Sequence, residues 1–171
     1  GVYRDNPKGE ELSEITNAFA VLAGSKHGET ICKRLGRDSA LAAATLYGRY
    51  YLLRALDKTG AYEVAPALLD HWYKMMETDL TTFAENPFPA RSFCHAWSAA
   101  PLYEFLAQIL GVKPSEPGWK RVRIKPHLWD LTHASGVVPT PFGPISVSWK
   151  IDSGTFTLDV SAPESLPAEV V

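Results

Sequence analysis

The sequence predicts an α+β protein of two segregated modules, a helical region followed by an antiparallel β region. Apolar residues recur every three or four positions in the first part of the chain, and they alternate with polar residues in the last part. Between the two lies "GVKPSEPGWK", whose prolines and glycines are typical of a boundary. Helices and strands that are separated along the chain favour two modules over an alternating α/β fold. We therefore expect domains at residues 1–112 and 113–171.

Helical spacing recurs through the first module. The expected helices are residues 10–25, 27–36, 39–60, 62–77 and 98–111. Asp38 or Ser39 is the expected N-cap of the third, and Pro66 is tolerable in the first turn of the fourth. The third and fourth helices would then form a helical hairpin. In the last helix the expected core-facing residues are Leu102, Phe105, Leu106 and Ile109.

In the second module, apolar and polar residues alternate with a period of two. The expected strands are residues 122–124, 145–151 and 155–160. The triplet "DSG" between the last two is a hairpin turn, and "PTPFGP" is an earlier turn. The final residues resemble the beginning of one more strand.

Composition limits the classes of partner. The net charge of −2 and the isoelectric point near 6.2 offer no general attraction to nucleic acid or to an anionic membrane. The basic cluster "WKRVRIKP" alternates as a strand does, so we interpret it as a solvated strand face. No stretch reaches the ~20 apolar residues of a membrane span, and the first residues contain no apolar signal segment. We expect neither a nucleic-acid nor a membrane partner, while the compartment stays open among cytoplasm, periplasm and secretion.

Metal and cofactor motifs are not found in the sequence. Cys32 and Cys94 lie in no CxxC pattern, and the five histidines lack ligand spacing. There is no glycine-rich phosphate loop, no HExxH and no GxSxG. We therefore predict no metal site and no cofactor.

The stretch "TTFAENPFPARSFCHAW" is the one candidate for chemistry. Its acid, Glu85, stands in a loop, because Pro87 and Pro89 prevent a helix. A loop carboxylate on a rigid scaffold can act as a general base toward water. A helix cap or a solvated side chain is the alternative interpretation, and spacing alone favours it.

His95 and nearby aromatic residues could complete a sugar site. His95 could hydrogen-bond a substrate hydroxyl or orient the carboxylate, although its spacing alone favours a core histidine. Phe83, Phe93 and Trp97 could form a stacking floor, because the C–H face of a sugar is apolar, but such aromatics are more often core residues. A Cys94–His95 nucleophile is disfavoured, since adjacent residues point apart.

The segment 80–128 resembles the C-terminal part of bacterial α-L-rhamnosidases. The matching positions are Thr81, Thr82, Phe83 and Glu85, then Ser92 and His95, and then Gly111, Pro114, Pro117, Gly118, Trp119, Ile124 and Pro126. Upstream, "SEITNAFAVLAG" and "YYLLRAL" are similar to late helices of that family's barrel. The resemblance implies the end of an (α/α)6 barrel followed by a C-terminal β-sandwich, in an enzyme that hydrolyses terminal α-L-rhamnosyl bonds with inversion.

The resemblance also implies roles for individual residues. Glu85 matches the family's general base, and His95 matches a histidine that lines the sugar subsite. Trp97 and Phe83 lie beside these positions and are expected to contact the sugar. Asn17 matches a family position to which we assign no role. The family often has tryptophan immediately before its catalytic glutamate, whereas this chain has Ala84.

Inversion needs a second carboxyl group as general acid, about 6.5–9.5 Å from the base. In the family that acid comes from an earlier part of the barrel, and the carboxylates of Glu10, Glu11, Glu14 and Glu104 do not match its motif. We therefore expect the isolated chain to be inactive. We also expect it to associate with the remaining barrel or with itself.

Two further functions remain open from the sequence. The chain could be a non-catalytic carbohydrate-binding or structural module in which Glu85 is only a cap. It could also belong to another (α/α)6 glycosidase, such as a relative of α-L-fucosidases, because one fold serves many chemistries.

Overall fold

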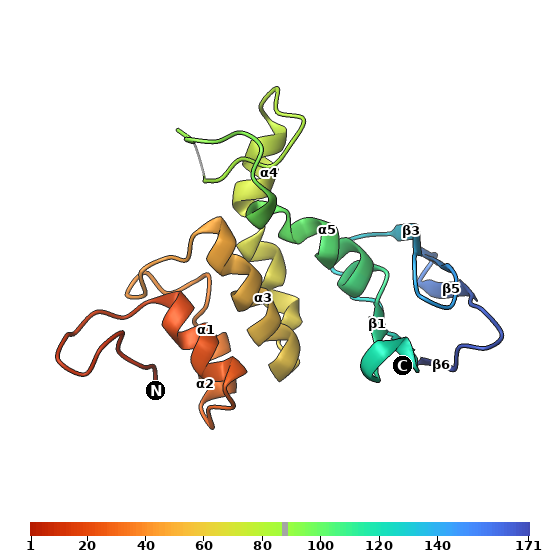
Figure 1. Ribbon diagram of the computed structural model, residues 1–171, viewed down its shortest axis with the longest axis horizontal. Helices are drawn as coiled ribbons and strands as arrows, with labels where there is room; N and C mark the ends of the chain where they lie inside the picture. The colour runs from red at the N-terminus through yellow and green to blue at the C-terminus, as the bar shows by residue number, and fades with distance from the viewer. Residues whose placement is uncertain (87–88) are drawn as a thin grey trace. The chain divides into compact units, whose positions relative to one another are not determined.

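A computed structural model describes residues 1–86 and 89–171 of the chain (Figure 1). The residues form two compact units, Gly1–Ala100 and Pro101–Val171. Helices dominate the first unit and all six strands lie in the second, so the predicted α+β class is confirmed. Pro87, which was expected to prevent a helix, lies outside the described residues.

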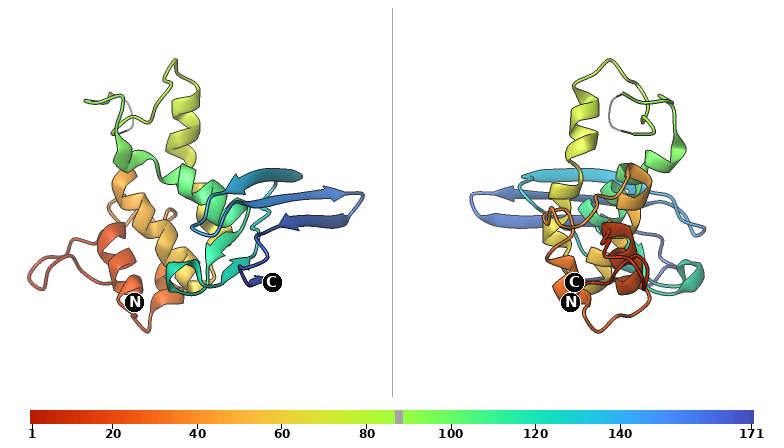
Figure 2. Two further views of the ribbon diagram at one scale, coloured as in Figure 1. Left: turned by 45° about the vertical axis from the view of Figure 1, so that its right-hand side comes forward. Right: turned by 90° about the vertical axis from the view of Figure 1, so that its left-hand side faces the viewer.

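The first unit is built around one long helix. Its elements are α1 (Glu14–Leu22), α2 (Gly28–Cys32), α3 (Leu46–Thr59), η1 (Tyr62–Leu68), α4 (Asp70–Met76) and η2 (Ala96–Ser98). α3 packs against α1, α2 and η1, and the two views of Figure 2 show it beside α1. Its buried leucines Leu52, Leu53 and Leu56 fill the centre of this unit.

The start of α3 differs from the prediction. The helix begins at Leu46 rather than near Ser39, and the Thr45 hydroxyl caps it by accepting a hydrogen bond from the Gly48 N–H at 3.3 Å. Upstream, Ala42 pairs with the chain before α1, because its N–H donates to the Leu12 carbonyl at 2.8 Å. The alanine-rich segment has helical propensity, but this pairing holds it extended.

A buried carboxylate joins α1 to the chain between α2 and α3. Glu14 is 4% exposed, and its two oxygens accept hydrogen bonds from the N–H groups of Gly36 at 2.6 Å and Ala44 at 2.8 Å. Both N–H groups lie outside the helices, and the Glu14 carboxylate supplies their hydrogen-bond acceptor. Glu14 is therefore a structural residue of the fold.

The helix predicted over residues 62–77 is broken in the structure. A 3₁₀ helix, η1, contains Pro66, and α4 begins only at Asp70. Proline inside a helix removes an N–H donor and crowds the preceding turn, which explains the interruption. The two pieces still bury Leu68, Trp72 and Met75.

The second unit begins with α5 (Ala100–Glu104), which the structure continues as a π-helical turn, η3 (Phe105–Ile109). The predicted apolar face of this segment is only partly correct. Ile109 is buried, whereas Leu102 is 56% and Phe105 is 52% exposed. Glu104 and Gln108 are instead fully buried. The π turn changes the helical period, so the spacing of three and four no longer defines one face.

Two three-stranded sheets follow. The strands are β1 (Val112–Pro114), β2 (Val122–Ile124), β3 (His133–Val138), β4 (Ile145–Asp152), β5 (Thr155–Ser161) and β6 (Ala168–Val170), with η4 (Pro117–Trp119) between β1 and β2. One sheet has the order β1-β2-β6 and the other β3-β4-β5. β1 and β3 were not predicted, and β6 corresponds to the expected final strand.

Most strand pairs are antiparallel, as predicted. β2 and β6 are the exception, because they pair in parallel through Val122 and Ala168. A parallel pair needs a long connection, and the second sheet occupies the chain between these strands. Apolar side chains of both sheets share one core, which includes Ile124 and Trp149, so the arrangement is compatible with a β-sandwich.

The core of the second unit extends into η3. The Trp149 indole N–H donates to the Ile109 carbonyl at 2.9 Å, and Leu110 packs in the same core. For this reason the compact units divide at Ala100/Pro101. The domain boundary at 112/113 lies further along the chain and stays a prediction, as does the (α/α)6 barrel. No helix in the described part of the chain is long and apolar enough to cross a membrane.

Replacement of Glu14 by alanine tests its structural role. The change removes two charge-assisted hydrogen bonds in partly buried surroundings, so we expect the free energy of unfolding to fall by about 2–4 kcal/mol in urea denaturation. Glu10→Ala is the control, because Glu10 is exposed and its ion pair with Arg4 should contribute less than about 1 kcal/mol. Equal stability of the two variants would contradict this role.

Candidate active site

The loop between α4 and η2 carries the candidate residues, and main-chain hydrogen bonds close it on itself. The Glu85 N–H donates to the Ser92 carbonyl at 2.9 Å, and the His95 N–H donates to the Phe83 carbonyl at 2.8 Å. The Thr82 hydroxyl also donates to the carbonyl of Phe93. The segment 83–85 therefore lies alongside the segment 92–95, and this brings the predicted site residues together.

Glu85 has a buried carboxylate. Its side chain is 2% exposed, and both of its oxygens accept hydrogen bonds from Arg91. The Arg91 Nε donates to Oε2 at 2.9 Å, and a terminal nitrogen donates to Oε1. Arg91 itself is 81% exposed, so its guanidinium covers the carboxylate from the solvent side. This fork of two parallel hydrogen bonds is a geometry that arginine favours with carboxylates.

The ion pair holds Glu85 in its charged form. The hydrogen bonds from Arg91 lower the pKa of Glu85 below its ordinary value of 4.5, against the opposing effect of burial. The charges of Arg91 and then of His95 lower this pKa further. Glu85 therefore carries a negative charge at neutral pH. A carboxylate has about four lone-pair positions, so Arg91 leaves some able to accept a proton from water.

His95 and Trp97 form a second part of the site. Their ring centroids are 4.2 Å apart, and the Trp97 ring also contacts Tyr47 of α3 at 5.5 Å. His95 is half-buried, whereas Trp97 is 46% exposed. A half-buried imidazole beside an exposed indole can offer one hydrogen-bonding group and one stacking surface to a ligand.

Phe83 lies in a different environment from Trp97. It lines a pocket beside α4 together with Trp72, Met75 and Thr82. Trp97 packs instead against His95 and Tyr47, and Phe93 is 52% exposed. A shared stacking floor of these aromatic residues therefore stays a prediction.

Arg91 is the residue that sequence reasoning missed. Its separation of six residues from Glu85 matches no helical or strand spacing, and the pair forms only because the loop returns on itself. Asn17, to which no role was assigned, has a structural one. Its side chain binds the carbonyls of Tyr3 and Ser13 and accepts from the Tyr3 N–H.

The two cysteines are free thiols. Cys32 is buried and Cys94 is exposed, and neither forms a disulfide. Within residues 1–86 and 89–171, the structure has no group of three or more His, Cys, Asp or Glu side chains that could hold a metal ion.

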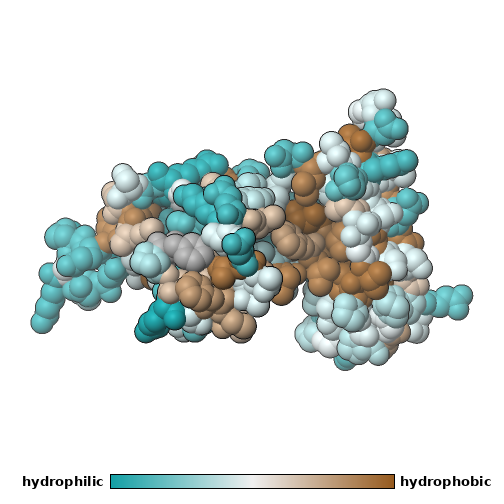
Figure 3. Space-filling model, turned by 90° about the horizontal axis from the view of Figure 1, so that it is seen from above, coloured by the Kyte–Doolittle hydropathy of each residue, from teal (hydrophilic) through white to brown (hydrophobic). Residues whose placement is uncertain are grey.

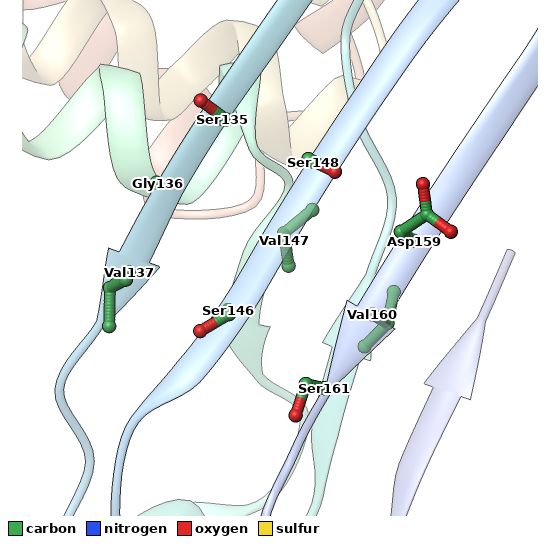
Figure 4. Close-up of a pocket in the computed structure, with 9 residues that line it drawn as sticks. All are labelled: Ser135, Gly136, Val137, Ser146, Val147, Ser148, Asp159, Val160 and Ser161. Carbon is green, nitrogen blue, oxygen red and sulfur yellow. The ribbon is translucent and has the colours of Figure 1, made fainter.

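The second unit has a pocket that involves none of the predicted site residues. Figure 4 shows it on the β3-β4-β5 sheet, where small hydroxyl side chains and one acid lie on neighbouring strands. Its polar residues are Ser135, Ser146, Ser148, Asp159 and Ser161. Strand register places Ser148 opposite both Ser135 and Asp159. Val137, Val147 and Val160 also line the pocket, so its surface combines hydroxyls and one carboxylate with apolar side chains.

Removal of the Arg91 side chain tests the electrostatics of the site. In Arg91→Ala we expect the pKa of Glu85 to rise toward its ordinary value, because the carboxylate loses two charged hydrogen bonds and a neighbouring positive charge. Folding lowers this pKa, so the pair stabilises the fold above pH 4.5 and this stability is lost as pH falls through the folded pKa.

Carbon NMR of the Glu85 carboxyl measures this pKa directly, and unfolding as a function of pH measures the linked stability. Arg37→Ala removes an exposed arginine outside the loop and serves as the control. A Glu85 titration that is unchanged in Arg91→Ala would refute the effect assigned to the ion pair.

The sequence matches known proteins. Residues 111–171 match the model of the bacterial alpha-L-rhamnosidase C-terminal domain. An alpha-L-rhamnosidase of Alteromonas sp. (strain LOR) is 46% identical over 68 residues, which are 39% of this chain and 7% of that protein. One from Formosa agariphila is 29% identical over 140 residues, 72% of this chain and 15% of that protein.

The fold also matches solved structures. A GH78 family rhamnosidase of Bacillus sp. GL1 has a TM-score of 0.87 and 32% identity, covering 95% of this chain and 19% of that one. The Streptomyces avermitilis alpha-L-rhamnosidase complexed with L-rhamnose has a TM-score of 0.67 and 28% identity, covering 73% and 14%. This chain thus spans less than a fifth of the length of each of these four relatives. The resemblance read from the motifs is confirmed: the chain is similar to α-L-rhamnosidases, and its residues 111–171 match the C-terminal domain of the bacterial proteins.

Proposed function

We propose that this chain supplies the general base and part of the sugar site for inverting hydrolysis of a terminal α-L-rhamnoside. Glu85 takes a proton from a water molecule, whose oxygen attacks the anomeric carbon. The bond from that carbon to the leaving oxygen breaks, and a second carboxyl group gives its proton to the leaving oxygen. The α-linked sugar is released as the β anomer.

The observation that carries this proposal is the charged, buried carboxylate of Glu85. A general base must be ionised before it can accept a proton, and the Arg91 ion pair keeps Glu85 ionised at neutral pH. A lowered pKa also makes the carboxylate a weaker base. Movement of the exposed Arg91 away from Glu85 when substrate binds would uncover the carboxylate and raise its basicity.

His95 and Trp97 are proposed to hold the rhamnose ring. The imidazole would hydrogen-bond a sugar hydroxyl, and the exposed indole would pack against an apolar C–H face. Their contact at 4.2 Å lets one ring position the other. The main-chain bond from His95 to Phe83 fixes this pair relative to the loop that carries Glu85. Phe83 would border the site on the α4 side.

The general acid is proposed to lie outside residues 1–171. Glu14 already binds two main-chain N–H groups, and Glu104 is fully buried in the second unit. Glu10 is exposed and paired with Arg4. We therefore expect residues 1–171 alone not to hydrolyse an aryl α-L-rhamnoside.

Replacement of Glu85 by glutamine tests the base. In the natural full-length polypeptide that contains these residues, we expect Glu85→Gln to lower kcat by about 10²–10⁴-fold, because general-base catalysis is lost. KM should change little, since the amide keeps the shape of the carboxylate. The measurement is initial-rate hydrolysis of an aryl α-L-rhamnoside, with NMR of the first anomer released.

Glu77→Gln is the matched control, because Glu77 is an exposed acid at the end of α4. Near-normal turnover by Glu85→Gln would remove Glu85 from the mechanism. Release of the α anomer first by the unsubstituted protein would show retention and would refute inversion.

Glycan binding without hydrolysis is a second candidate function, favoured by the hydroxyl-lined pocket of the second unit. It requires residues 1–171 alone to fold cooperatively and to bind a rhamnose-containing glycan. Asp159→Ala should then weaken binding about 10-fold in calorimetry, because a charged hydrogen bond is lost, while Glu85→Gln should not affect it. Binding that Asp159→Ala leaves unchanged would exclude this pocket as the site.

A further inference from the structure

The main chain of His95 is held on both of its sides. Its N–H donates a hydrogen bond to the Phe83 carbonyl at 2.8 Å. Its carbonyl oxygen accepts two hydrogen bonds from Ser98, one from the hydroxyl at 2.7 Å and one from the main-chain N–H at 3.2 Å. A carbonyl oxygen has two lone pairs, so these two bonds use its full capacity. Ser98 therefore fixes the direction in which the chain leaves His95 and enters η2.

Ser98 is itself anchored to a different helix. It is fully buried, and its carbonyl accepts a hydrogen bond of 2.7 Å from the indole N–H of Trp72. Trp72 lies in α4 and is only 5% exposed. Because α4 precedes the loop of the candidate site and η2 follows it, this bond joins the two ends of the loop. We call Ser98 and Trp72 the clamp.

The clamp is distinguished by its buried hydrogen bonds and not by the surface of the molecule. On the face drawn in Figure 3, hydrophobic and hydrophilic side chains are intermixed, so surface chemistry does not single out the residues that hold the site. A serine often bonds the carbonyl three residues before it. Ser98 differs from that common case because it also receives a bond from α4, and because the carbonyl that it holds belongs to His95.

We propose that Ser98 and Trp72 are positioning residues of the sugar site and that they act through His95. This inference rests on the function proposed above, in which the His95 imidazole hydrogen-bonds a hydroxyl of the rhamnose. The clamp fixes the carbonyl side of His95, and the bond to Phe83 fixes its N–H side beside the segment that carries Glu85. The imidazole is thereby placed before the sugar arrives, which lowers the entropy cost of binding.

Loss of the Ser98 hydroxyl should affect sugar binding more than proton transfer. The His95 carbonyl would keep only the longer bond of 3.2 Å, so the turn could open and move the imidazole. Hydrogen bonds weaken steeply when their angle is distorted, and a small misplacement of a binding group is costly. The bonds from Arg91 to Glu85 do not involve the clamp. The expected kinetic result is a rise in KM that exceeds the fall in kcat.

The test is a double-mutant cycle in the natural full-length polypeptide that contains these residues. Initial rates of hydrolysis of an aryl α-L-rhamnoside are measured for the unsubstituted protein, Ser98→Ala, His95→Ala and the variant with both changes. We expect Ser98→Ala to lower kcat/KM about 10-fold, mainly through KM. In the His95→Ala background the same change should lower kcat/KM less than about 2-fold, because no imidazole is left to position.

Two further variants make the result specific. Trp72→Phe keeps an aromatic ring in the core but lacks the N–H, so its loss of kcat/KM should also nearly vanish in the His95→Ala background. It replaces the test if Ser98→Ala does not fold. Thr59→Val is the matched control, because it removes a hydroxyl that donates to the Ala55 carbonyl at 3.1 Å within α3, outside the loop. Thr59→Val should leave kcat/KM unchanged.

An unchanged kcat/KM in Ser98→Ala would overturn the proposal. So would a loss of the same size with and without the His95 side chain, because the clamp would then act only as part of the core. If the unsubstituted protein does not hydrolyse the rhamnoside, or if His95→Ala keeps full activity, the proposed function itself fails and the clamp proposal fails with it. The two failures therefore give different patterns of rates.

Discussion

Two main-chain hydrogen bonds define the candidate site, because they close the loop between α4 and η2. The bonds from Glu85 to Ser92 and from His95 to Phe83 bring distant parts of the loop together. Without them, neither regular element around the loop would hold the acid beside the histidine. The ion pair with Arg91 also depends on this closure, since residues six apart meet only when the chain reverses. A loop fixed in this way can place functional groups while the helices supply rigidity.

Electrostatics and aromatic packing divide the site into two parts. Arg91 keeps the Glu85 carboxylate charged and covered, and this suits a base that is released when substrate displaces the guanidinium. His95 connects this charged part to the exposed Trp97 ring, because it lowers the pKa of Glu85 and also contacts Trp97. Proton transfer and sugar recognition are thus proposed to meet at one histidine. The second unit contributes its own core, to which Trp149 ties the π turn that precedes the strands.

Local sequence signals predicted the segregated fold and the position of Glu85 between helices. The α3 start was missed because pairing of Ala42 with Leu12 overrides the helical propensity of an alanine-rich segment. Burial of Glu104 and Gln108 was missed because a π turn alters the period on which the prediction relied. The Arg91 partner was missed because the pair forms only where the loop returns on itself, and no helical or strand spacing encodes that return.

A crystal structure of the natural full-length polypeptide with L-rhamnose tests the central claim most directly. We expect rhamnose beside His95 and Trp97, and a water molecule that donates a hydrogen bond to Glu85 and faces the anomeric carbon. We also expect a second carboxyl group about 6.5–9.5 Å from Glu85 on the opposite side of the sugar. Rhamnose bound away from Glu85, or Glu85 still covered by Arg91 with no water between acid and sugar, would contradict the assignment of Glu85 as the general base.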